Sequence, residues 1–186
     1  MAEEKLISAP DEESLWLKLT ADLSAIPDLL EYHATLQQDE MRVLLDIEID
    51  PGGGFEGGYG YTSFSSFLFM GGDFRFAIHQ QSFVDEIGKF FGMQDVKLGY
   101  PEFDERFIVK TNDPSKCRAL FEDVACRSIL QQLPDCSFGI VRYALQDNPD
   151  SVPFLELRLD EAVTNPDLLR SAYAAFSHVL NKLNLQ

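Results

Sequence analysis

Three carboxylates alternate along one stretch of the chain and are the residues best placed to do chemistry. Asp46, Glu48 and Asp50 lie two positions apart, which puts them on one face of a β-strand. Glu56 follows in the next loop. Such oxygens suit Ca²⁺ or Mg²⁺, but the spacing does not fit a calcium-binding loop. Carboxylates on a strand commonly face solvent and discourage edge pairing. The pattern therefore favours a solvated strand face, and we assign no metal site.

A glycine-rich loop follows these carboxylates. Residues 51–60 read PGGGFEGGYG, in which Gly52, Gly54 and Gly57 match the GxGxxG spacing of dinucleotide-binding loops. That site also needs a helix to begin after the loop, because the helix N-terminus holds the pyrophosphate. The following residues have the composition of a strand, and the lysine of a phosphate-binding loop is missing. We expect a flexible hairpin loop and no cofactor.

No spacing of histidine, serine or cysteine assembles a catalytic set, so we assign no catalytic residue. The three histidines are far apart in the sequence, and no GxSxG motif is present. His79 is retained as a candidate because it falls on the strand face opposite a run of apolar residues. Cys117 and Cys126 fall on an expected helix, where they would pack as small apolar groups. The odd number of cysteines matches no zinc pattern and indicates a reducing compartment.

The charge balance narrows the possible partners. The chain has 31 acidic and 15 basic residues and a net charge of −16. A chain this acidic repels phosphate backbones and anionic membrane surfaces. We expect no nucleic acid and no membrane as partner, and a basic protein, a cation or no partner at all fits better. The N-terminus has no apolar run typical of a signal, so we expect a cytoplasmic location.

Aromatic residues gather in and after the glycine loop. Phe55, Tyr59 and Tyr61 are the best candidates for contact with a partner, and Phe64 and Phe67 follow them. Core packing is the competing interpretation, and for Phe64 and Phe67 it is the better one. The chain has fifteen Phe and one Trp, which indicates a core or a groove built on phenylalanine.

Apolar periodicity and turn residues divide the chain into helices and strands. We expect an N-terminal helical region over 11–37, broken near 24–27, and a short helix over 82–92. Two further helices begin at Asp113-Pro114 and Asn165-Pro166, where an N-cap residue precedes proline; the first has a break near Glu122. The expected strands cover 41–50, 61–70, 73–80, 95–98, 103–111, 137–145 and 154–160, of which the first three form an antiparallel meander.

Runs of strands between helices predict an α+β fold. We expect a mostly antiparallel sheet of five to seven strands, flanked by N-terminal, central and C-terminal helices. The length fits one domain, residues 1–186.

One segment resembles a known pattern. In EFDERFIVKTNDP, the Phe103-Asp104 pair, Phe107 and Val109 are followed by Asp113-Pro114 and a helix. This arrangement is similar to a short signature in bacterial proteins of unknown function. The resemblance covers about residues 95–141 and implies a fold unit without an activity. Asp104 and Arg106 are expected to form a surface ion pair on the strand or its turn.

These observations favour a non-catalytic domain that binds a protein partner or associates with itself. Binding would involve the aromatic residues and the acidic strand. The first alternative is an enzyme whose site combines Asp46, Glu48 and Asp50 with the glycine loop and His79. The second is a small-molecule carrier with a phenylalanine-lined cavity between sheet and helices.

Overall fold

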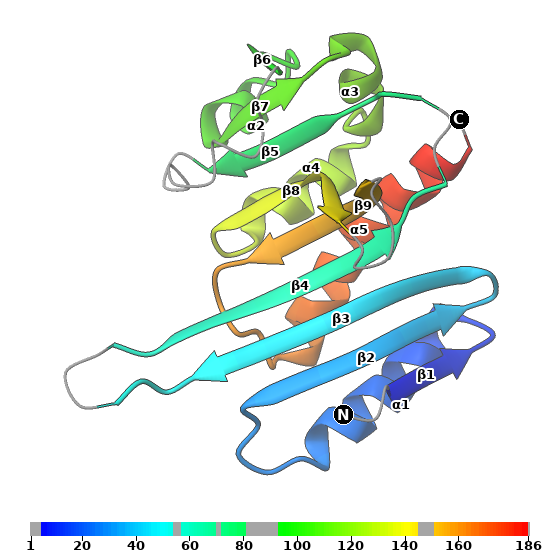
Figure 1. The fold of residues 1–186 in the computed structure, drawn as a ribbon, viewed down its shortest axis with the longest axis vertical. Helices are drawn as coiled ribbons and strands as arrows, with labels where there is room; N and C mark the ends of the chain where they lie inside the picture. Colours follow the sequence, from blue (N-terminus) through cyan, green and yellow to red (C-terminus); the bar gives the residue numbers. More distant parts are fainter. Residues whose placement is uncertain (1–4, 54–56, 70–71, 81–92, 145–150, 186) are drawn as a thin grey trace.

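The computed structural model describes residues 5–53, 57–69, 72–80, 93–144 and 151–185. These residues form nine strands and five helices (Figure 1). The strands are β1 (Lys5–Ala9), β2 (Glu31–Gln38), β3 (Met41–Asp50), β4 (Tyr59–Phe67), β5 (Phe76–Gln80), β6 (Gln94–Val96), β7 (Phe107–Thr111), β8 (Cys136–Ala144) and β9 (Ser151–Leu159). The helices are α1 (Glu12–Ser24), α2 (Pro101–Arg106), α3 (Pro114–Leu120), α4 (Val124–Gln132) and α5 (Pro166–Asn184).

All nine strands belong to one sheet with the order β1-β2-β3-β4-β9-β8-β5-β7-β6. Every neighbouring pair is antiparallel except β1 with β2. The predicted α+β class and mostly antiparallel sheet are confirmed, but the sheet is larger than the five to seven strands expected. The two additional strands are β1 and β2, and residues 31–37 had been assigned to the N-terminal helical region. β2 pairs with β3 along eight residues in a hairpin that turns at Asp39 and Glu40, so cross-strand pairing overrides an ambiguous local pattern.

The expected meander of three strands is wrong at its third member. β3 and β4 form the predicted hairpin around the glycine loop. β9 occupies the other side of β4, whereas β5 lies between β8 and β7. Gly71, half of the predicted hairpin turn, and the predicted helix over 82–92 lie outside the described residues. The chain therefore leaves β4 and joins a different part of the sheet.

The helices cover one face of the sheet. In Figure 1, α1, α4 and α5 lie behind the strands, and the face toward the viewer carries no described helix. The long α5 buries one stripe, and its Tyr173 and Phe176 contact Phe64 of β4 with ring centroids 6.1 and 6.2 Å apart. Each buried aromatic ring of this kind stabilises the fold by roughly 1.5–3 kcal/mol. Among the described helices, none is long and apolar enough to cross a membrane.

Four helix starts have a side-chain cap, the first being Asp11, which accepts a hydrogen bond from Ser14 N at the start of α1. Asp113 accepts hydrogen bonds from the backbone N–H groups of Ser115 and Lys116, and Asn165 caps α5 in the same way. Asp123 caps α4. The predicted Asp-Pro and Asn-Pro helix starts are confirmed, as is the break near Glu122 that separates α3 from α4.

The segment that resembled a strand with a surface ion pair folds differently. Residues 101–106 form α2, and the strand begins only at Phe107. Asp104 is buried, and its carboxylate accepts hydrogen bonds from the backbone N–H groups of Leu98, Gly99 and Tyr100. Arg106 donates to the Leu133 carbonyl instead of pairing with Asp104. Pro101 at the first helical position favours this short helix, and the buried carboxylate fixes the loop before it.

Removing the Asp104 carboxylate should destabilise the protein strongly. Asp104→Ala leaves three backbone donors without an acceptor, so we expect a loss of about 3 kcal/mol in the free energy of unfolding. Urea denaturation followed by circular dichroism measures this loss. The matched control is Glu105→Ala, whose side chain is exposed on the same helix; it should change stability by less than about 0.5 kcal/mol. Equal effects for the two variants would contradict the role assigned to Asp104.

All three cysteines should be unreactive in the folded protein. Cys117, Cys126 and Cys136 are free thiols and buried, and burial raises the pKa of each to about 12. Because the thiolate is the reactive species, we expect Ellman's reagent to modify no cysteine at neutral pH and all three in urea. Rapid modification of any of them in the native state would show that this part of the core is open.

Candidate functional site

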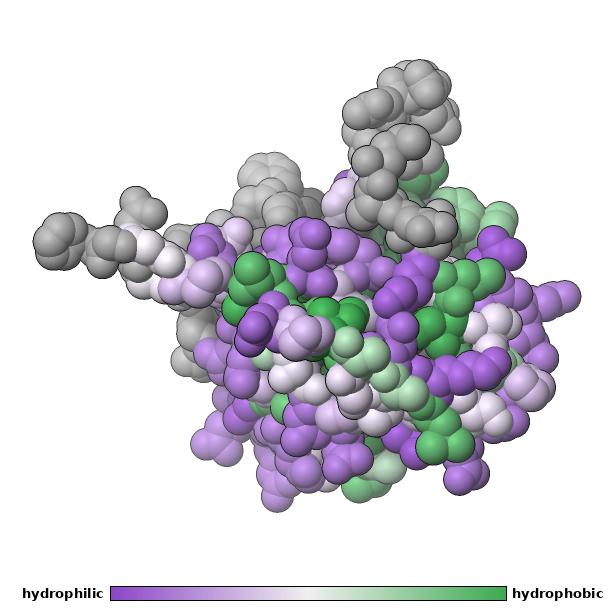
Figure 2. All heavy atoms as spheres, turned by 90° about the horizontal axis from the view of Figure 1, so that it is seen from below, coloured by the Kyte–Doolittle hydropathy of each residue, from purple (hydrophilic) through white to green (hydrophobic). Residues whose placement is uncertain are grey.

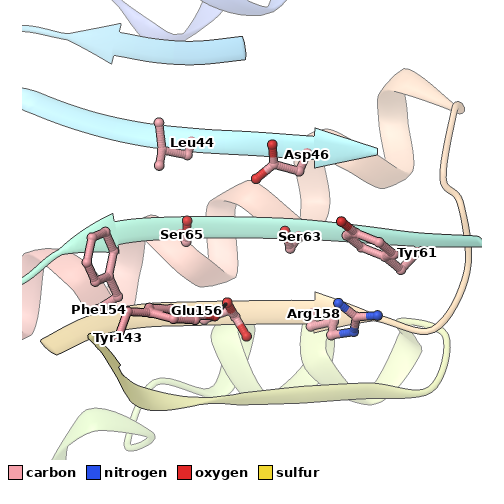
Figure 3. A pocket seen from close by; sticks show the side chains of 9 residues that line it. All are labelled: Leu44, Asp46, Tyr61, Ser63, Ser65, Tyr143, Phe154, Glu156 and Arg158. Carbon is pink, nitrogen blue, oxygen red and sulfur yellow. Dashed lines mark hydrogen bonds between the residues drawn. The ribbon is translucent and has the colours of Figure 1, made fainter. Parts of the chain in front are cut away.

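A shallow trough runs along β4 on the face of the sheet that the helices leave uncovered. Ser63 and Ser65 of β4 form its floor, and Figure 3 shows them between larger side chains from the two neighbouring strands. One wall consists of Leu44 and Asp46 from β3, and the other of Glu156 and Arg158 from β9. We call this feature the β4 trough, an open pocket of about 370 Å³.

The register of the strands sets the pattern of the β4 trough. Asp46 pairs with Ser63, which pairs with Arg158, so the acid and the base face each other across one serine. Leu44 and Glu156 face each other across Ser65 in the same way. The walls are two strand spacings apart, about 9–10 Å. In the described part of the chain no ion pair closes the trough between Asp46 and Arg158.

The two floor serines are unusual for an uncovered sheet face. They are only 7% and 8% exposed, because the longer wall side chains rise above them. Neither hydroxyl has a hydrogen-bond partner among the described residues, although each can donate one hydrogen bond and accept two. The serines are buried as residues, while their hydroxyl oxygens still contact water at the floor of the trough. The floor of the trough therefore offers unused hydrogen-bonding capacity to a ligand.

Arg158 is held in place by an aromatic ring. Its guanidinium lies 4.0 Å from the centre of the Tyr61 ring, a cation–π contact. The Tyr61 hydroxyl donates a 2.7 Å hydrogen bond to Glu48. Arg158 Nε lies 3.9 Å from Asp160 Oδ1, at the outer limit of an ion pair. The guanidinium is thus fixed by stacking while much of its hydrogen-bonding capacity is unused.

Both wall carboxylates are oriented by a neighbour. Asp46 Oδ1 lies 2.7 Å from His33 Nδ1 of β2, and Glu156 accepts a hydrogen bond from the Tyr143 hydroxyl of β8. Each contact involves one carboxylate oxygen and leaves the other directed elsewhere. Supported carboxylates of this kind can receive a cationic group without first ordering their own side chains.

Aromatic side chains close one end of the β4 trough. Phe154 contacts the rings of Phe67 and Tyr143, with centroids 5.7 and 5.6 Å apart. Phe67 also meets Phe69, which is 90% exposed. This end is apolar and aromatic, whereas the end near Arg158 is charged. A ligand would meet an apolar surface and a polar surface within one pocket.

The end of the sheet beside the trough is strongly acidic. Residues 5–50, which contain β1–β3 and α1, include eleven Asp and Glu and only three Lys and Arg. Figure 2 looks onto this end, whose surface is mainly hydrophilic with separate small apolar patches. Residues 97–127, toward the opposite end, contain six acidic and six basic residues. The acidity is therefore concentrated at one end, and a basic partner would be drawn there.

The structure brings together some of the residues singled out in the sequence. Asp46 and Tyr61 line the trough, and Glu48 reaches it through Tyr61. Asp50 instead accepts a hydrogen bond from Gly52 N and fixes the hairpin turn. Tyr59 is exposed beside the glycine loop. Phe55 lies outside the described residues.

His79 lies on the same sheet face but away from this pocket. It is buried in β5 and pairs in register with Ser137 of β8, which separates it from Arg158 of β9. The acidic strand and His79 therefore do not converge in the trough.

Sequence reasoning missed most of the trough. The serines, both residues of the β9 wall and Tyr143 were not singled out. The signal lay in the alternation of residues 61–65, where Phe64 turns inward and Ser63 and Ser65 turn outward. The β9 residues could not be found in this way, because their position beside β4 depends on a pairing between segments about ninety residues apart.

The arrangement does not match common catalytic geometry. In a serine hydrolase the imidazole lies between the carboxylate and the hydroxyl. Here Asp46 is the middle member, with His33 on β2 and Ser63 on β4 at either side. Within the described ranges no three His, Cys, Asp or Glu side chains gather as metal ligands. The trough instead presents charged side chains on its walls and two hydroxyls on its floor.

The comparisons with known proteins add no identity: no family model matches the chain, and no curated protein matches it significantly.

The Tyr61–Glu48 pair gives a test of the trough geometry. Burial, the hydrogen bond to Glu48 and the nearby Asp46 charge raise the pKa of Tyr61 to about 12. Glu48→Gln removes one negative charge, so the pKa should fall toward its ordinary value while burial still holds it above that value. NMR titration of ¹³C-labelled tyrosine, assigned with Tyr61→Phe, measures the change.

The raised pKa of Tyr61 also sets how the stability of the fold depends on pH. The folded state favours the neutral phenol. The contribution of Tyr61 to the free energy of unfolding is therefore fully present below pH 10 and is lost as the pH rises through about 12. Glu105→Gln, on the exposed side of α2, is the control and should leave the Tyr61 titration unchanged. An identical titration in Glu48→Gln and the unaltered protein would contradict the pairing.

Proposed function

We propose that this chain is a protein-binding domain that receives a segment of a partner protein in the β4 trough. The observation that carries the proposal is the pair of largely buried serines on the trough floor, whose hydroxyls have no partner within the described chain. Charged and aromatic residues surround them within one pocket. Together they provide hydrogen bonds, charge and an apolar anchor, which are the elements of a binding surface.

The shape of the site supports an extended segment more than a compact small molecule. The trough is open above its floor and lies along a strand, between walls contributed by β3 and β9, which run parallel to each other. Exposed Phe69 and Tyr143 extend the apolar surface beyond one end. A flat, elongated contact area of this kind suits a peptide or protein surface. The enclosed pockets of small-molecule sites bury most of their ligand.

Core packing does not favour the carrier alternative. Phe76, Phe121 and Phe138 contact one another with centroids 5.6–6.3 Å apart, and Phe103 continues this cluster. The rings fill the space between sheet and helices that a lipophilic ligand would need. Eight of the eleven phenylalanines in the described residues are buried, so most of them belong to this interior.

Filling the trough should abolish binding without unfolding the protein. Random dodecapeptides displayed on phage should be enriched on the immobilised full chain. Ser65→Phe, which places a ring on the trough floor, should lose that enrichment. Leu44→Arg changes an exposed wall residue and should also lose it, which keeps the test valid if Ser65→Phe is unstable. Deep sequencing of the selected pools measures the result.

The matched control is Leu17→Phe, which adds a ring at an exposed position of α1 on the helical side. It should select the same peptides as the unaltered chain. Enrichment no higher than on uncoated beads, or the same peptides on all variants, would overturn the proposal.

A further inference from the structure

We infer that the occupant of the β4 trough is a basic segment that presents a lysine or arginine beside an apolar side chain. This inference depends on the proposed binding function and adds the chemistry of the partner. The cationic group would lie over the two serines, within reach of Asp46 and Glu156. The apolar side chain would lie against Phe154 and Leu44.

The positions of the carboxylates argue for the cationic group. Asp46 stands on the β3 wall beside Ser63, and Glu156 stands on the β9 wall beside Ser65. They therefore approach the floor diagonally from opposite sides. An ammonium or guanidinium above the floor would meet two carboxylates and two hydroxyl acceptors. Hydrogen bonds from a charged donor to such acceptors are about twice as strong as neutral ones.

The single trough arginine does not reverse this preference. Arg158 is stacked on Tyr61 and has Asp160 as its nearest carboxylate, so part of its charge is balanced within the protein. Residues 5–50, at this end of the sheet, contain eight more acidic than basic residues. An anionic ligand would cross this field to reach Arg158, whereas a basic segment is attracted by it.

The same charge argues against a second copy of the chain as occupant. Two copies that joined through this face would bring two acidic ends together, and each chain has a net charge of −16. Like charges brought together across an interface disfavour the complex. A basic partner gains from the same charges that oppose self-association.

The apolar part of the occupant follows from the aromatic end. Phe154 is partly exposed and supported by Phe67 and Tyr143, and Leu44 is 38% exposed on the opposite wall. An aliphatic or aromatic side chain placed there would cover these groups. Aromatic anchors near a charged contact commonly supply most of the binding energy.

The test compares peptides selected by charge variants of the full chain. Dodecapeptides selected on the unaltered chain should be rich in Lys or Arg next to an apolar residue. A synthetic peptide from that pool should bind about tenfold more weakly to the double variant Asp46→Asn and Glu156→Gln, and more weakly in high salt. Isothermal titration calorimetry measures both.

The control carries the same change in net charge at exposed positions outside the trough, Glu13→Gln and Glu105→Gln. It should bind the peptide within about twofold of the unaltered chain, since exposed distant charges are screened. Selected peptides that are neutral or acidic, or equal losses in both double variants, would overturn the inference while the binding function stands. No enrichment on any chain would overturn the binding function itself. A dimer in light scattering that the synthetic peptide fails to compete away would assign the face to a second copy and overturn the inference.

Discussion

The described helices pack on one face of the sheet, and much of the structure depends on that constraint. On β3, Val43, Leu45 and Ile47 point into the core and are fully buried, while the alternate residues lie on the uncovered face. The strand period of two forces this division along the chain. The side chains on the helix-covered face therefore stabilise the sheet. In the proposed function, the side chains on the other face contact the partner. The β4 trough lies on that second side.

The centre of the sheet is joined by contacts between segments far apart in the chain. Thr62 of β4 donates a hydrogen bond to the Glu161 carbonyl and accepts one from Val163 N, which fixes the turn after β9. That turn leads into α5, whose Tyr173 and Phe176 return to pack on Phe64 of β4. Because the same strand holds the core contact on one face and Ser63 and Ser65 on the other, α5 indirectly positions the trough floor.

Local signals in the sequence predicted the local parts of the fold. The caps at Asp113 and Asn165, the hairpin around the glycine loop and the α+β class all follow from short-range chemistry. The failures have two causes. β2 was assigned to a helix because its own residues gave an ambiguous pattern, although its partner β3 follows after a two-residue turn. β5 was placed next to β4 because the distant partner of a strand cannot be read from its own residues. Asp104 was placed at the surface because its three backbone donors come from a loop conformation that the sequence does not specify.

The trough was found only in part, because its residues come from strands of two kinds. Asp46 and Tyr61 belong to the predicted hairpin, whereas Glu156 and Arg158 come from a strand whose position in the sheet was unknown.

The serines of β4 show how the proposed binding capacity and the stability of the strand compete in this sheet. Serine has a lower preference for central strands than threonine or valine, which would pack between the walls. Larger residues there would fill the trough, cover the sheet face and leave no unused hydroxyl. Strand β4 therefore obtains its stability from Phe64 and the inward face, while its outward face keeps small polar groups. Stacking on Tyr61 and the hydrogen bonds from Tyr143 and between His33 and Asp46 keep the walls upright around those groups. A trough held open by its own neighbours can accept a ligand at low cost in conformational entropy, because few of its side chains remain to be ordered.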